Sequence, residues 1–225
     1  MLSFIDLPAS CRARRVTVRL AATLSLLGAA AIPSATAGAQ VGSSPYLGSF
    51  TYTTASPSGD AKTFANSFSW LGFTIEGDWF NRPNVSTGFI AGWQEIYKNQ
   101  GGDSFVFDNG TVTGSTYRHI SSIPLLLRAR YWRGHHGDAF HPFLGLGVGT
   151  YWMKQTLDLG LYTAEESNWH FGLAPEVGVL MATKGGVGVT LNARYNYPFA
   201  AGSYLGGNSA SFSYWGFGVG LAYGQ

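Results

Sequence analysis

The stretch that decides the fold is WHFGLAPEVGVLM, residues Trp169–Met181. Its odd-numbered positions are all apolar, whereas its even-numbered positions are small, polar or charged except for Leu180. An alternation of period two predicts an extended strand with two different faces. The face of the small, even-numbered residues carries a lone carboxylate, Glu176. Strands of soluble sandwiches usually have about 5–6 residues, whereas a strand that crosses a bilayer at a tilt needs roughly 9–11. This stretch is therefore long enough to cross a membrane.

The composition of the 225-residue chain points in the same direction. Charged residues make up 12% of it and aromatic residues 15%, and there are 31 glycines; the charged fraction is about half the usual quarter. No unbroken apolar run of about 18 residues follows the N-terminal segment, so no transmembrane helix is predicted. Apolar residues spread over alternate positions are typical of a membrane barrel. On composition alone, a soluble β-sandwich or lipocalin-like barrel remains the alternative.

Residues 1–39 read as a secretory signal peptide. Four arginines between Arg12 and Arg19 precede the apolar run Leu20–Ile32, and Ala37–Ala39 supplies the small residues of a cleavage site before Gln40. The predicted organisation is therefore a signal peptide, 1–39, followed by a barrel domain, 40–225.

Removal of the signal changes both the thiol content and the charge of the chain. The only cysteine, Cys11, lies within it, so no disulfide or thiol chemistry is expected afterwards. Without the four arginines and Asp6 of the signal, the 14 basic and 12 acidic residues become 10 and 11, a formal charge of −1. We therefore expect no nucleic-acid partner.

Strand-like alternation recurs along the whole domain. The predicted strands are Ser44–Thr54, Ser67–Trp79, Val85–Tyr97, Thr111–Trp132, Phe140–Met153, Trp169–Met181, Gly186–Phe199 and Ser211–Tyr223. The connections alternate between long (55–66, 98–110, 158–167, 200–210) and short (80–84, 133–139, 183–186). An even number of strands with this alternation predicts an all-β fold, an eight-stranded antiparallel up-and-down transmembrane β-barrel with its long loops outside the cell. Aromatic residues near the strand ends fit interfacial girdles: Trp79, Trp93, Tyr97, Tyr131, Trp152, Trp169, Tyr197, Trp215 and Tyr223.

Two local features qualify this pattern. Pro124 inside the fourth strand removes a backbone donor and predicts a bulge or kink. Gly145, Gly147 and Gly149 resemble a phosphate-binding loop only superficially, because the period is two and no helix follows. Glycine at alternate positions instead leaves room inside a narrow barrel.

Four segments of this pattern carry a family resemblance: GLGVGTYW (145–152), WHFGLAPEVGVLM (169–181), VGVTLNARYNY (187–197) and FGVGLAY (217–223). Together with the signal peptide, they resemble the small outer-membrane β-barrels of the OmpA- and OmpW-like kind. The resemblance implies location in the cell outer membrane and an envelope-structural role or narrow porin-like passage of small molecules. We expect outer-membrane lipid, lipopolysaccharide and the barrel-assembly machinery as partners, and we expect no cofactor and no enzymatic activity.

The end of the chain departs from that family. It closes on Tyr223-Gly224-Gln225 rather than on the C-terminal aromatic residue common in such barrels. No peptidoglycan-binding domain follows the barrel, so a cell-wall tether is not expected.

Polar side chains on the faces assigned to the interior form the first candidate site. An eight-stranded barrel is just wide enough for side chains to fill it, and a lone buried charge costs several kcal/mol, so these charges must be paired. The favoured interpretation is a plug that locks the lumen, and the alternative is a gated polar path. The predicted network comprises Glu76, Arg128, Arg130, Glu176, Arg194 and Asn192, with Gln94, Thr190 and Asn196 beside it.

The second candidate site is on the outer face of the fourth strand, where His119 and Ser121 look like the His-x-Ser motif of outer-membrane lipid A deacylases. A serine nucleophile needs a base within reach and a third group to orient that base. Position 122 is Ser, and no acid follows until Asp138. A lipid A hydrolase is therefore an alternative rather than the expectation. A surface adhesin acting through the long loops is the other alternative.

Neither of two further polar clusters predicts a metal site. The first surrounds a short turn and matches no closed zinc site; it comprises His135, His136, Asp138 and His141. The second lies in the acidic loop and offers at most contact with cations that bridge lipopolysaccharide phosphates; it comprises Asp158, Glu165 and Glu166.

Overall fold

The computed structural model describes residues 45–107, 110–134, 138–159, 162–183, 186–201 and 211–224. The predicted signal peptide lies outside these residues. The elements are β1 (Tyr46–Pro57), α1 (Gly59–Phe64), β2 (Gly72–Arg82), β3 (Val85–Phe107), β4 (Gly110–Trp132), β5 (Phe140–Leu159), β6 (Tyr162–Ala182), β7 (Val187–Pro198) and β8 (Tyr214–Tyr223). Within the described part of the chain, no helix is long and apolar enough to span a membrane.

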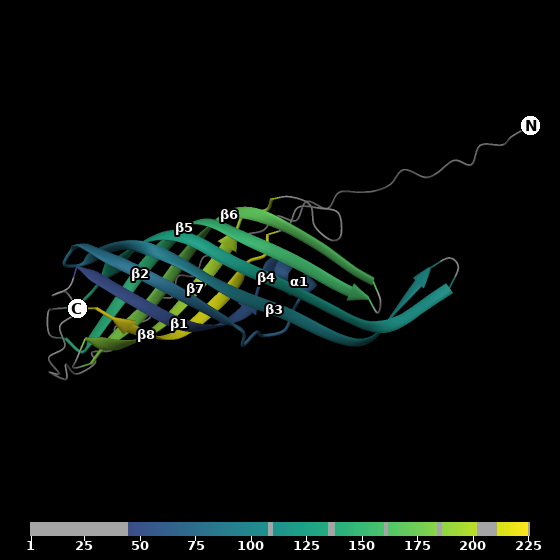
Figure 1. Ribbon diagram of the computed structural model, residues 1–225, viewed down its shortest axis with the longest axis horizontal. Coiled ribbons are helices and arrows are strands. Elements are labelled where there is room, and N and C mark those ends of the chain that lie inside the picture. Colours follow the sequence, from purple (N-terminus) through teal and green to yellow (C-terminus); the bar gives the residue numbers. More distant parts are fainter. Residues whose placement is uncertain are drawn as a thin grey trace, which may run out of the picture. The chain divides into compact units, whose positions relative to one another are not determined.

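The eight strands form a closed antiparallel barrel in chain order, and β1 pairs with β8 to complete the ring (Figure 1). The predicted eight-stranded up-and-down barrel is thus confirmed. The predicted faces also hold: outward side chains such as Leu127, Leu144 and Leu221 are 70%, 62% and 61% exposed, whereas their neighbours along each strand point inward.

The strand register gives the tilt of the barrel. A row of paired residues that starts at Phe171 of β6 passes once around the ring and returns to β6 at Met181, a shift of ten residues from 171 to 181. With about 3.3 Å per residue and about 4.8 Å between strands, this shift tilts the strands by about 40°. That tilt lies in the range of transmembrane barrels, roughly 35–45°.

Two predicted loops are wrong, because the strands continue into them. β3 and β4 form a hairpin in which Phe107 pairs with Gly110, and β5 and β6 form a hairpin in which Leu159 pairs with Tyr162. Polar residues suit strands that have left the membrane, so composition alone did not separate them from loops. β3 pairs with β2 only as far as Gln94, so the two hairpins extend past the remaining strands (Figure 1).

The connection between β1 and β2 also differs from the prediction. It contains the short helix α1, and β2 begins at Gly72 rather than Ser67. The buried Ser69 forms two 2.8 Å backbone hydrogen bonds with Ala55, which draws this segment out of the β2–β3 ladder. The alternation of the predicted strand Ser67–Trp79 would put Trp70 on the interior face with Glu76, but Trp70 lies outside the strand and is 61% exposed.

The bulge predicted at Pro124 is absent. Ala91 lies opposite Leu125 and Gln94 lies opposite Ser122, so the β3–β4 register is the same on both sides of the proline. The missing donor interrupts the pairing without shifting it. On its other side, Pro124 stays in register with Tyr151 of β5.

Candidate functional site in the barrel lumen

Glu76 is the centre of a buried ion-pair network in the lumen. It projects inward from β2, and its side chain is inaccessible to solvent. Its carboxylate accepts hydrogen bonds from Arg128 Nη1 at 2.6 Å, Arg130 Nη2 at 2.9 Å and Arg194 Nη2 at 2.6 Å. One carboxylate therefore contacts guanidinium groups from β4 and β7, across the width of the barrel.

Asp78 and Glu176 complete the network. Arg128 binds Asp78 through two bonds, Nη2–Oδ2 at 2.5 Å and Nε–Oδ1 at 3.1 Å. Arg130 donates to Asp78 at 2.9 Å and to Glu176 at 2.6 Å, and Arg194 donates to Glu176 at 2.9 and 3.1 Å. Three carboxylates thus balance three guanidinium groups, and the enclosed charge sums to zero.

Glycines on the neighbouring strands make room for these large side chains. Gly147 lies opposite Arg128, and Gly145 lies opposite both Arg130 and Glu176. A Cβ atom at Gly145 would lie 2.7 Å from Glu176 Oε1 and 3.0 Å from Arg130 Cγ. The alternating glycines therefore serve to fit the network into a narrow lumen.

The structure brings together five of the six residues predicted for the network: Glu76, Arg128, Arg130, Glu176 and Arg194. Asn192 is buried but its Nδ2 has no partner in the described structure, and it is not bonded to the charges. Asp78 was missed, although its position two residues after Glu76 placed it on the same face.

A small cavity of about 20 Å³ lies beside the network. That volume accommodates about one water molecule. Its lining includes Thr53, Thr74, Gln94, Asn192, Arg194, Asn196 and Tyr214. The cavity is too small to pass a solute.

Apolar side chains close the lumen at both ends. Toward the turns, Trp132, Phe143 and Leu180 are buried together, and the Arg130 guanidinium lies 4.2 Å from the Phe143 ring centre. Toward the loops, a second cluster fills the lumen and receives α1; it contains Phe64, Ile96, Ile120, Met153 and Phe212. The charged network is therefore enclosed between two apolar layers.

His119 and Ser121 lie on the outer wall, as predicted, but they are not arranged as a nucleophile and its base. The Ser121 hydroxyl donates to the carboxylate of Glu95, which is opposite it on β3. Among the described residues, no hydrogen bond joins Ser121 to His119. Glu95 is an acid that the sequence did not reveal, because it comes from a neighbouring strand rather than from a position downstream.

The two remaining clusters do not form a metal site in the part of the chain that is described, where no group of three or more His, Cys, Asp or Glu side chains can hold an ion. His135 and His136 lie outside the described residues. His141 is buried on β5, with Nε2 2.8 Å from the carbonyl oxygen of Asp138. Of the acidic residues, Asp158 accepts from Thr163 at 2.6 Å and Glu165 pairs with Lys154 at 2.8 Å.

No protein-family model matches the chain, and a comparison with curated proteins finds no match. Solved structures are similar to it. Neisserial surface protein A is 17% identical, with a TM-score of 0.49, over 80% of this chain and 96% of that one. The outer membrane protein OprG from Pseudomonas aeruginosa is 14% identical, with a TM-score of 0.47, over 83% of this chain and 97% of that one. Ail, the attachment invasion locus protein of Yersinia pestis, is 13% identical, with a TM-score of 0.44, over 79% and 97% respectively. All three are small outer-membrane β-barrels, the group that the sequence resembles.

Proposed function

We propose that this protein is an outer-membrane β-barrel with a closed lumen, a structural role in the envelope and no enzymatic activity. The observation that carries the proposal is the neutral network around Glu76, whose arginine and carboxylate side chains are at most 6% exposed. It joins β2, β4, β6 and β7 across the interior. A cross-linked interior suits a barrel that resists deformation better than one that opens a path.

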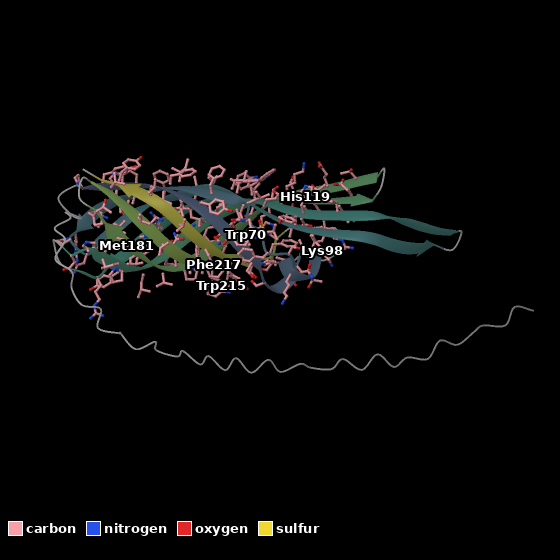
Figure 2. The ribbon with its side chains drawn as sticks, turned by 90° about the horizontal axis from the view of Figure 1, so that it is seen from below. Trp70, Lys98, His119, Met181, Trp215 and Phe217 are labelled. Atoms are coloured by element: carbon pink, nitrogen blue, oxygen red, sulfur yellow. The ribbon has the colours of Figure 1, made fainter. Side chains whose placement is uncertain are left out.

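The outer wall supports the membrane location. Trp169 and Met181 lie twelve positions apart on β6, from 169 to 181, and at about 3.3 Å per residue with a tilt of about 40° their separation along the barrel axis is roughly 30 Å. The hydrocarbon core of a bilayer is about 30 Å thick. Figure 2 shows Met181 toward one end of the barrel and His119 toward the other. The predicted signal peptide is consistent with export to this membrane.

The energetics favour a plug over a pore. An ion on its way through the lumen would have to displace paired charges whose side chains are at most 6% exposed to solvent. Breaking a buried ion pair by removing one partner costs about 3–5 kcal/mol. The apolar layers formed by residues such as Phe143 and Ile120 would add further barriers.

The first test is single-channel conductance of the protein purified from cell envelopes and inserted in a planar bilayer. We expect a silent barrel that still shows the heat-modifiable gel mobility of a folded one. Glu176→Gln and Arg194→Ala, measured in parallel, are expected to produce openings because each leaves the network unbalanced. Discrete openings of the wild type that both substitutions alter would instead identify the lumen as a conduction path and contradict the proposal.

A second test addresses the hydrolase alternative. Because the Ser121 hydroxyl is bonded to Glu95 rather than to an imidazole, we expect lipid A from cells that express the wild type to keep all its acyl chains. Mass spectra of that lipid A, compared with spectra from cells expressing Ser121→Ala, are expected to be the same. Deacylated lipid A that disappears with Ser121→Ala would show that the outer wall carries a catalytic site.

A further inference from the structure

The segment between α1 and β2 exposes an unusual set of apolar side chains. Phe68, Trp70 and Leu71 are 40%, 61% and 51% exposed. The rings of Phe68 and Trp70 meet edge to face with their centres 4.9 Å apart. No charged residue occurs between Lys62 and Glu76. In water, this surface would be an apolar patch without a partner.

The register places this patch at the height of the aromatic girdle. Because the strands are tilted, a row of paired residues moves along the barrel axis by ten residues over eight strands, or about 1.25 residues per strand. Residues at the same height along the axis are found by correcting the paired row by this amount, toward the loops, at each strand. By this measure, the level of Trp169 on β6 corresponds to Tyr97 on β3 and to Phe68 in the continuation of β2. Because β2 starts only at Gly72, Phe68 and Trp70 occupy the part of the girdle that no strand supplies.

Hydrogen bonds hold the segment against strands β1 and β3. The Tyr52 hydroxyl donates to the carbonyl of Trp70, and the Ser69 hydroxyl donates to the carbonyl of Glu95. The Leu71 carbonyl accepts from Glu95 N at 2.9 Å and from Gln94 Nε2 at 2.8 Å. The apolar side chains are therefore presented outward by a fixed backbone.

The other end of the same connection enters the lumen. Ala61 and Ala65 are fully buried and Phe64 is 4% exposed, within the apolar cluster at the loop end of the barrel. Between Ala65 and Phe68 there are only two residues, Asn66 and Ser67. The connection thus straddles the rim, with the buried face of α1 packed on the apolar cluster of the lumen and the patch formed by Phe68, Trp70 and Leu71 outside.

We propose that Phe68, Trp70 and Leu71 form a lipid anchor, inserted among the acyl chains of the outer leaflet, that holds α1 over the lumen. We infer that lipid covers this patch because the patch is continuous with the outer wall of the barrel. That wall begins at Phe73 and Ile75, which are 38% and 50% exposed. Tryptophan and tyrosine are favoured at such membrane interfaces. The inference rests on the proposed location of the barrel in a membrane.

The test uses spin labels on single cysteines introduced into the full chain, with Cys11 replaced by serine, reconstituted in phosphatidylcholine vesicles. Collision rates with oxygen, which partitions into lipid, and with a water-soluble nickel chelate locate each label. A label on Trp70→Cys measures the environment of the anchor itself. A label on Ser67→Cys measures the environment next to the anchor while Phe68 and Trp70 are both retained. Phe217→Cys on the outer wall is the lipid control, and Lys62→Cys on the exposed side of α1 is the water control.

We expect the oxygen-to-nickel ratio at Trp70 to be closer to that at Phe217 than to that at Lys62. A nickel-accessible label at Trp70, with Phe217 still in lipid, would overturn the anchor and leave the membrane barrel intact. A label at Trp70 that neither reagent reaches would also overturn it, because protein rather than lipid would then cover the patch. Nickel access at Phe217 would mean that the proposed membrane location itself is wrong.

Discussion

Replacing Glu76 by glutamine is expected to lower the free energy of unfolding by roughly 3–5 kcal/mol, the usual cost of leaving a buried ion pair without one partner. Glutamine keeps the shape of the side chain but removes the charge that Arg128, Arg130 and Arg194 share. The amide NH2 group of glutamine would also face guanidinium groups, which contain only hydrogen-bond donors and cannot accept its hydrogen bonds. The lumen would then enclose one uncompensated positive charge.

Urea unfolding of the barrel in vesicles, followed by gel mobility, measures this loss. Glu165→Gln is the matched control, because it removes the same charge from the exposed pair with Lys154 and should cost at most about 1 kcal/mol. The double substitution Glu76→Gln with Arg194→Gln restores neutrality and should recover part of the stability. If Glu76→Gln unfolds at the same urea concentration as Glu165→Gln, the network does not stabilise the barrel.

Gly88→Ala is expected to be the most damaging of the small substitutions, with a loss of about 3 kcal/mol or failure to assemble. A Cβ atom at Gly88 would lie 1.9 Å from the carbonyl oxygen of Gly77 and 2.9 Å from the carboxylate of Asp78. The first of these is a backbone atom of the adjacent strand, so the strands would have to separate. The second would disturb the network directly.

Gly216→Ala provides the control on the same inward face. Its Cβ would meet Asn196 Nδ2 at 3.4 Å, an ordinary contact, and alanine there should change stability by less than about 1 kcal/mol. The two variants are compared by the folded fraction after refolding and by urea midpoint. Equal midpoints for both would show that the interior adapts to added volume and that its glycines are not required for packing.

The alternation of the chain was enough to predict the barrel, its faces and most of the charged interior. Glu76 and Glu176 could be placed inward because period two fixes the face of every residue in a strand. Strand ends were harder to predict, because the sequence near the paired ends of β3 and β4, and of β5 and β6, is polar and resembles a loop. The dipeptide Asn109-Gly110 is a strong hairpin signal in the sequence, and β4 begins at Gly110.

Side-chain contacts between neighbouring strands could not be predicted from the sequence, because they depend on the strand register. Glu95 lies next to Ser121 only because of the β3–β4 register. Asn192 has the predicted face and a polar side chain, yet its buried Nδ2 has no hydrogen-bond partner among the described residues. The exposure of Trp70 follows from hydrogen bonds made by Ser69, which period two alone does not predict.

The charges of the network are also distributed evenly along the chain. The first four strands supply Glu76 and Asp78 together with Arg128 and Arg130, and the last four supply Glu176 together with Arg194. Each half of the chain is therefore neutral within the network before the other half joins it. A barrel that forms by the union of two four-stranded sheets never has to carry an unbalanced interior charge into the membrane, and closure of the ring only adds contacts between two balanced sets.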